Sequence, residues 1–81
     1  MARFVSSRNP ISANTLKRKP IGAIVVRSSG YEDLKFTRVE GGWRRERTDV
    51  TSEKPTVVTS SEVANECNTA VGCRESWARV Y

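Results

Sequence analysis

The sequence predicts a small α+β domain: a curled, mainly antiparallel sheet of three to five strands, one helix near the C-terminus, and a basic N-terminal arm. Three observations lead to this prediction. Short apolar runs bounded by Gly, Pro and Ser are typical of strands. One later segment, residues 59–72, repeats apolar residues at helical spacing. The chain of 81 residues is long enough for a single domain only.

Positive charge is concentrated at the N-terminus. Residues 1–30 contain six basic and no acidic side chains, whereas residues 31–81 contain eight basic and nine acidic ones. Residues 1–19 also have little apolar periodicity and many Ser, Asn, Pro and Lys residues, which favour turns over regular structure. We therefore expect residues 1–19 to form a basic arm or loop and residues 20–81 to form the domain. Such an arm suits contact with nucleic acid or an acidic protein, and a merely solubilising segment is the alternative.

The clearest strand is Pro20–Arg27, with the sequence PIGAIVVR. Its residues Ile24, Val25 and Val26 are β-branched, and the turn-forming Ser28-Ser29-Gly30 follows at once. An unbroken apolar run predicts a strand covered on both faces, which places it at the centre of the sheet. The next strand is expected to begin near Tyr31.

The segment LKFTRVEGGWRRERTDV, residues 34–50, predicts a hairpin. Gly41-Gly42 suits both central positions of a type I′ turn, which would set Glu40 opposite Trp43. Alternation along the two strands then puts one set of side chains on a single side of the sheet: Leu34, Phe36, Arg38, Trp43, Arg45 and Arg47. We expect the three apolar members to reach the core while the arginine stems flank them.

A helix is predicted after Thr59-Ser60-Ser61-Glu62, which has the spacing of a capping box. The preceding TVVT is a short strand or a lead-in to this helix. The apolar stripe and the glycine expected to end the helix follow in order: Val63, Cys67, Ala70, Val71 and Gly72. The terminal ESWARVY fits either a final strand or a continued helix, and the glycine favours the strand.

Catalysis is not expected, because the chain has no histidine and so lacks the commonest general base near neutral pH. Cys67 and Cys73 are the only cysteines, too few for a zinc site without histidine. We expect both thiols to be reduced and Cys67 to be a small buried apolar residue. No cofactor or metal is predicted. No apolar run approaches a membrane span and no secretory signal is apparent, so a cytoplasmic location is expected.

Basic residues around one tryptophan suggest a binding site. An aromatic ring flanked by arginines can stack on a base while the guanidinium groups contact phosphates. The candidate binding residues are Trp43 with its neighbours Arg38, Arg44, Arg45 and Arg47, and the basic run Lys17, Arg18 and Lys19. Acidic residues such as Glu40 and Glu46 interrupt this pattern, so a mixed-charge hairpin with a core tryptophan is the alternative.

Large amphipathic side chains suggest protein binding instead. Trp43, Trp77, Tyr31 and Tyr81 are many for so small a domain, and aromatic and arginine side chains are enriched at interfaces. Any of the four left exposed would be an anchor for a partner. The alternative is that all four build the core.

Four segments follow one another along the chain: PIGAIVV, KFTRVEGGWRRE, SSEVANE and SWARVY. On these segments residues 20–81 resemble the small accessory proteins, early and non-virion, of actinobacterial phages. The chain departs from that pattern at Phe36, where a second tryptophan or tyrosine is common, and in its three arginines after Trp43. The resemblance implies a protein that binds and alters a host factor, and it assigns no functional residues.

The sequence thus predicts a non-enzymatic, phage-encoded binding protein that inhibits or redirects a host protein in the host cytoplasm. The alternative is a small nucleic-acid-binding protein that uses the N-terminal arm and the Gly41-Gly42 hairpin. A minor virion component is the third hypothesis. The identity of the partner and the oligomeric state stay open, and a homodimer is allowed.

Overall fold

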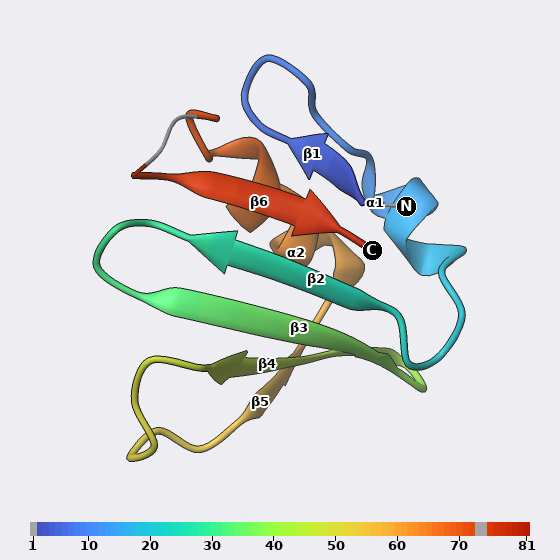
Figure 1. Cartoon of the computed structure of the whole chain (residues 1–81). Helices are drawn as coiled ribbons and strands as arrows, with labels where there is room; N and C mark the ends of the chain where they lie inside the picture. The colour runs from blue at the N-terminus through green and yellow to red at the C-terminus, as the bar shows by residue number, and fades with distance from the viewer. Residues whose placement is uncertain (1, 73–74) are drawn as a thin grey trace.

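A computed structural model describes residues 2–72 and 75–81, which form a six-stranded antiparallel sheet with two helices against one side of it (Figure 1). The strands lie in the order β1-β6-β2-β3-β4-β5. In chain order the elements are β1 (Arg3–Val5), α1 (Ala13–Lys17), β2 (Ile24–Ser28), β3 (Asp33–Val39), β4 (Gly42–Arg47), β5 (Thr56–Val58), α2 (Ser60–Asn68) and β6 (Trp77–Val80). The α+β class is confirmed, but there are more strands than the three to five expected, and two helices instead of one.

The additional strand and helix lie in the segment that was expected to be a basic arm. β1 pairs with β6, with Arg3 opposite Val80, and α1 packs against α2. Val5, Ile11 and Leu16 from this segment are buried in the core. The division at residue 19 is therefore corrected: single apolar residues five or six positions apart show no local periodicity, and only tertiary packing reveals their role.

The strand β2 is central, between β6 and β3, as its composition suggested. Val25 points to the helix side and is fully buried, whereas Ile24 and Val26 on the other side are half-buried. The apolar run is thus covered by helices on one face only. The terminal segment ends in the strand β6, which lies between β1 and β2 (Figure 1).

The hairpin of β3 and β4 turns one residue earlier than expected. Val39 is opposite Gly42, so Glu40 and Gly41 form the turn, and Trp43 faces Arg38 instead of Glu40. Gly41 has a φ of +82° while Glu40 has no positive φ, which excludes a type I′ turn. The shift preserves the predicted sides, because each residue moves by two positions relative to its partner.

Gly42 lies in the strand because β5 approaches it too closely for a side chain. A Cβ at this position would be 2.7 Å from the carbonyl oxygen of Val58. Glycine inside a strand commonly marks such a close approach of another backbone. The second glycine of the pair therefore serves strand packing and not the turn.

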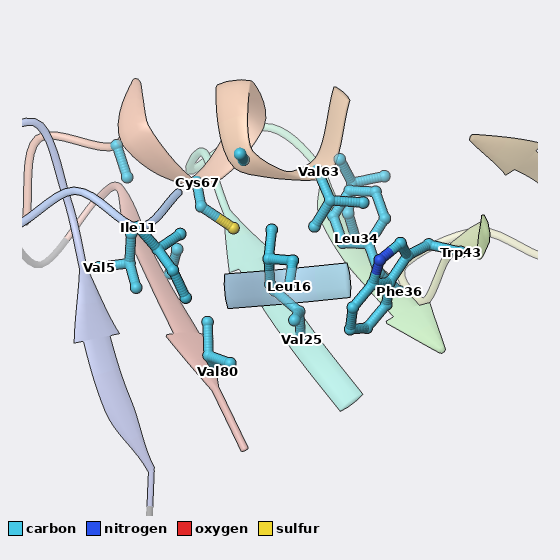
Figure 2. Packing of buried hydrophobic residues seen from close by; sticks show 13 residues of the cluster. Val5, Ile11, Leu16, Val25, Leu34, Phe36, Trp43, Val63, Cys67 and Val80 are labelled. Atoms are coloured by element: carbon cyan, nitrogen blue, oxygen red, sulfur yellow. The ribbon is translucent and has the colours of Figure 1, made fainter. Parts of the chain in front are cut away.

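The core fills the space between the sheet and the helices (Figure 2). Phe36 and Trp43 from the sheet pack with Val63 of α2, and Leu16 of α1 lies near Val25 (Figure 2). All of the core side chains on the strands point to the same side, as the alternation of residues requires. The core comprises Val5, Ile11, Leu16, Val25, Leu34, Phe36, Trp43, Val63, Ala64, Cys67, Ala70, Ala78 and Val80.

The helix α2 begins after Thr59, whose hydroxyl accepts a hydrogen bond from the backbone N–H of Glu62 at 3.1 Å. It ends at Asn68, before the predicted stop at Gly72. The Asn68 side chain accepts a hydrogen bond from the Ile11 N–H and donates one to the Ile11 carbonyl, both at 2.8 Å. Past this point Val71 is exposed, so it does not belong to the apolar stripe as predicted.

Candidate binding surface

Trp43 is a core residue and not a surface anchor. Its exposed fraction is 0%, and its Nε1 donates a hydrogen bond to the Ser60 hydroxyl at 3.1 Å. The prediction that its ring is a direct contact for a partner is therefore corrected, and the alternative of a core tryptophan describes its position. A ring without exposed surface cannot stack on a base.

Arg38 stabilises the hairpin from the side of the sheet that faces the helices. Its Nη1 donates to the carbonyls of Val39 and Gly42, and its guanidinium carbon lies 5.9 Å from the centroid of the Trp43 ring. Its Nη2 reaches the Lys17 carbonyl at 3.4 Å. These contacts engage the guanidinium group within the fold.

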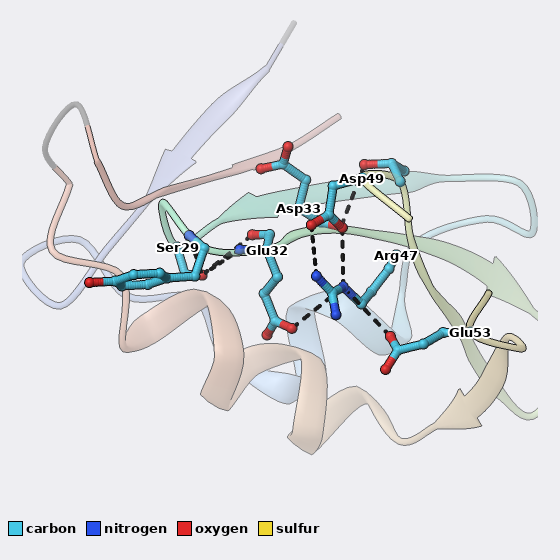
Figure 3. A network of polar contacts seen from close by, with 8 residues as sticks. Ser29, Glu32, Asp33, Arg47, Asp49 and Glu53 are labelled. Atoms are coloured by element: carbon cyan, nitrogen blue, oxygen red, sulfur yellow. Dashed lines mark hydrogen bonds and ion pairs between the residues drawn. The ribbon is translucent and has the colours of Figure 1, made fainter. Parts of the chain in front are cut away.

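Arg47 is held by three carboxylates (Figure 3). Its Nε and Nη2 donate to the two oxygens of Asp49 at 3.1 and 2.7 Å, and Glu32 and Glu53 approach its Nε to 3.7 and 3.5 Å. The hydrogen bonds to Asp49 raise the pKa of Arg47, and the same bonds lower the pKa of Asp49. The surrounding negative charge makes Arg47 a poor contact for phosphate.

The other nominated basic residues lie on different sides of the molecule. Arg44 is exposed and points away from the helices, whereas Arg45, opposite Phe36, shares the side of the core. Lys17, Arg18 and Lys19 lie at and after the end of α1. The structure therefore does not bring the eight predicted binding residues into one surface.

One cavity does unite two of these residues. Lys17 and Arg38 line a space of about 450 Å³ together with two glycines of the hairpin and three residues at the start of α2: Gly41, Gly42, Thr59, Ser60 and Ser61. A smaller space of about 290 Å³ is lined by Ser29, Gly30, Tyr31 and Glu75. Tyr31 is almost fully exposed, with 94% of its surface accessible.

A further candidate surface is the side of the sheet opposite the helices, which we call the open face. Figure 1 views the sheet from this side, with α2 behind it, and no element within residues 2–72 and 75–81 covers it. Its apolar and aromatic members are Phe4, Ile24, Val26, Val39, Val57, Trp77 and Tyr81. Its polar and charged members are Ser28, Asp33, Lys35, Thr37, Arg44, Glu46 and Arg79.

Arg79 on β6 contacts two aromatic rings of the open face. Its guanidinium carbon lies 4.6 Å from the centroid of the Phe4 ring and 5.2 Å from that of the Trp77 ring. Its Nε is buried and has no hydrogen-bond partner among the described residues. Cation–π contacts of this kind stabilise the position of a side chain on a surface by about 0.5–1 kcal/mol each.

Phe4 and Tyr81 remain accessible beside this stack, with exposed fractions of 55% and 50%. The strands β1, β2 and β6 contribute no acidic residue to their half of the face. Trp77 and Tyr81 were noted as potential anchors, but Phe4 and Arg79 were not identified as a site. Their proximity arises from the pairing of β1 with β6, which joins the two ends of the chain.

Cys67 is a core residue of α2. The thiol of Cys67 is fully buried, and burial raises its pKa to about 12, so it is a thiol and not a nucleophilic thiolate near neutral pH. The predictions for Cys73 lie outside the described residues. Within the described chain, no cluster of acidic and cysteine side chains is arranged to hold a metal ion. None of the described helices has the length and apolar character needed to cross a membrane.

Comparison with protein-family models, with curated proteins and with solved structures gives no match.

Proposed function

We propose that this chain is a non-enzymatic binding protein that acts on another protein through the open face of its sheet. The observation that carries the proposal is the position of Arg79 between Phe4 and Trp77, on a surface without a helix over it. Aromatic and arginine side chains contribute most to binding energy at protein interfaces. A guanidinium group that is already held in place loses less conformational entropy when a partner binds.

The mixed character of the face favours a protein partner over a polyanion. Half-buried Ile24 and Val26 lie at its centre, where an interface core is usually apolar. Asp33 and Glu46 lie on the same face as the basic residues and would repel a phosphate backbone. Opposite charges in one surface instead suit a partner with its own mixture of charges.

The resemblance to phage accessory proteins indicates the class of partner and the compartment in which the chain would act. It makes the partner a host protein in the host cytoplasm, which this chain would inhibit or redirect. The four segments of sequence that carry the resemblance support this part of the proposal.

The proposal is tested by affinity capture from an actinobacterial extract with the native chain and matched variants. Phe4→Ser and Tyr81→Ser each remove an exposed ring from the open face, and Val71→Ser removes an exposed apolar side chain elsewhere. Partners captured by the native chain should be lost with the first two variants and kept with the third. Partners kept by both open-face variants and lost with Val71→Ser would show that the surface is wrongly assigned.

Nucleic-acid binding is the second candidate, supported by the cavity beside α2. Lys17 and Arg38 line it together with Ser60 and Ser61, the first residues of the helix, whose backbone N–H groups favour an anion. A labelled single-stranded oligonucleotide titrated over a salt series tests it. Binding that weakens steeply with salt, and less steeply after Lys17→Gln, supports this candidate, whereas no binding at low salt removes it.

A further inference from the structure

We infer that the open face pairs with the open face of a second copy of this chain, in a dimer whose two-fold axis runs parallel to the strands between β2 and β3. This inference rests on the proposed function, because both assign the open face to protein contacts. It goes further by proposing that a second copy of this chain occupies the same face when the host protein is not bound there, and by specifying which residues of the two copies meet.

The strand registers arrange the open face in rows that cross the sheet. One row contains, from β1 to β4, Phe4, Arg79, Val26, Lys35 and Glu46. The next row contains, from the end of β6 to β5, Tyr81, Ile24, Thr37, Arg44 and Val57. Directly opposite residues in an antiparallel sheet point to the same side, so each row is a line of neighbouring side chains.

A two-fold axis parallel to the strands, at the middle of the strand order, places β6 over β4 of the second copy and keeps each row close to the same row of that copy. Arg79 then faces Glu46 of the second copy, and the symmetry makes this ion pair twice. In the next row Tyr81 faces Arg44 of the second copy, a cation–π pair. Both contacts follow from the strand order and registers alone.

An alternative two-fold axis lies in the plane of the interface, perpendicular to the strands. An axis perpendicular to the strands and centred on the row of Val26 would bring Arg79 over Arg79 and Glu46 over Glu46 of the second copy. Like charges brought together at an interface are unfavourable by several kcal/mol. The distribution of charge on this face therefore disfavours a perpendicular axis centred on this row.

In this dimer the remaining charged residues of the open face meet no like charge of the second copy. Asp33 faces the hydroxyl of Ser28 of the second copy, because these residues share a row. Lys35 lies beside Glu46 of its own sheet, and its stem covers Val26 of the second copy. The half-buried Ile24 and Val26 then lie near the axis, with the Arg79–Glu46 pairs farther out, which is the usual order of an apolar centre and a polar rim.

The dimensions also suit a face-to-face pair. Two sheets pack about 10 Å apart with their strands roughly 30° from parallel, a gap that an arginine and a glutamate bridge. The domain measures 31 × 31 × 21 Å, as expected of two layers whose sheet lies along the longer directions.

Sedimentation equilibrium of the purified full chain, from about 1 to about 200 µM, tests the inference. The native chain should dimerise. Arg79→Glu and Glu46→Arg should each weaken the dimer by about tenfold or more, because each creates two like-charge contacts. The double variant Arg79→Glu/Glu46→Arg should restore the dimer, and Lys54→Glu, an equal change of charge in an exposed loop, should leave it intact. Circular dichroism confirms that each variant is folded, and Glu46→Arg keeps the Arg79 stack intact.

A native chain that stays monomeric over this range overturns the inference, as does a dimer that neither single reversal weakens. Failure of the folded double variant to recover the dimer also overturns it, because the arrangement requires these two residues to meet. A monomer whose Phe4→Ser and Tyr81→Ser variants still lose a captured partner overturns self-association alone. If those variants alter neither the dimer nor the capture, the proposed function fails as well.

Discussion

Trp43 of β4 and Ser60 of α2 are joined by a buried hydrogen bond, in which the indole Nε1 donates to the serine hydroxyl at 3.1 Å. Both residues are almost entirely excluded from solvent. The bond fixes the start of the helix over the sheet at the place where the largest core side chain packs. It also explains why the ring at the centre of the arginine-rich hairpin belongs to the interior.

Ser60→Ala should lower the free energy of unfolding by about 1–3 kcal/mol, because it leaves the buried indole N–H without an acceptor. Urea unfolding followed by circular dichroism measures the change. Ser61→Ala is the matched control, since Ser61 is the next residue of the same helical turn and is exposed. Equal loss of stability in the two variants would contradict the role of the buried bond.

Gly42→Ala should loosen β5, because the added Cβ would lie 2.7 Å from the Val58 carbonyl oxygen. We expect faster amide hydrogen exchange in β5 and a loss of about 1–3 kcal/mol. Gly41→Ala is the control: its cost arises from the positive φ of the turn, and its Cβ has open space around it. Exchange in β5 should therefore change in the first variant only, and an equal effect of Gly41→Ala would argue against the close approach.

The hairpin also shows how far the sequence could predict the fold. Alternation along residues 34–47 predicts correctly which side Leu34, Phe36 and Trp43 share, because it depends only on the parity of positions in a strand. The turn itself was misplaced, since two adjacent glycines look alike in sequence. Only the packing of β5 distinguishes the glycine of the turn from the glycine of the strand.

The open face could not be predicted for a related reason. Phe4 and Arg79 are 75 positions apart in the chain and meet only because β1 pairs with β6. The N-terminal segment looked like an arm because its core residues, Val5, Ile11 and Leu16, are single and widely spaced. A helix cap such as Thr59 can be predicted from sequence, because the group that it binds, the N–H of Glu62, lies within one turn of the same helix.

The pair of Arg47 and Asp49 should contribute to stability in a pH-dependent way. The pKa of Asp49 is lowered in the folded state, mainly by its hydrogen bonds from Arg47. Its stabilising effect is therefore present above the ordinary carboxylate pKa of about 3.9 and is lost as the pH falls through the lower folded value. Urea midpoints measured across this acid range should fall less steeply for Asp49→Asn than for the native chain.

Arg47→Met provides the reciprocal test of this pair, because it removes the donor and keeps an unbranched apolar stem. It should flatten the acid profile as Asp49→Asn does, and the double variant should add little further change. Parallel profiles for the native chain and all three variants would contradict a contribution from this pair.

The Cys67 thiol should resist modification in the folded protein, because it is buried and its pKa is raised to about 12. In a Cys73→Ser background, reaction with a disulfide reagent at about pH 8 should be slow and should accelerate when denaturant unfolds the chain. Stability should also decline as the pH rises above the ordinary thiol pKa of about 8.5, since only the unfolded state then ionises. Rapid reaction of the native thiol would contradict its buried position.

Hydroxyl-radical footprinting of the native chain, read residue by residue with mass spectrometry, tests the central claim most directly. The claim is that helices cover one side of the sheet while the other presents aromatic side chains for contact. In dilute solution Phe4 and Tyr81 should oxidise readily while Phe36 and Trp43 stay protected, and Phe4, Trp77 and Tyr81 should gain protection as the concentration rises. Oxidation of Trp43 as fast as that of Tyr81 would contradict the account.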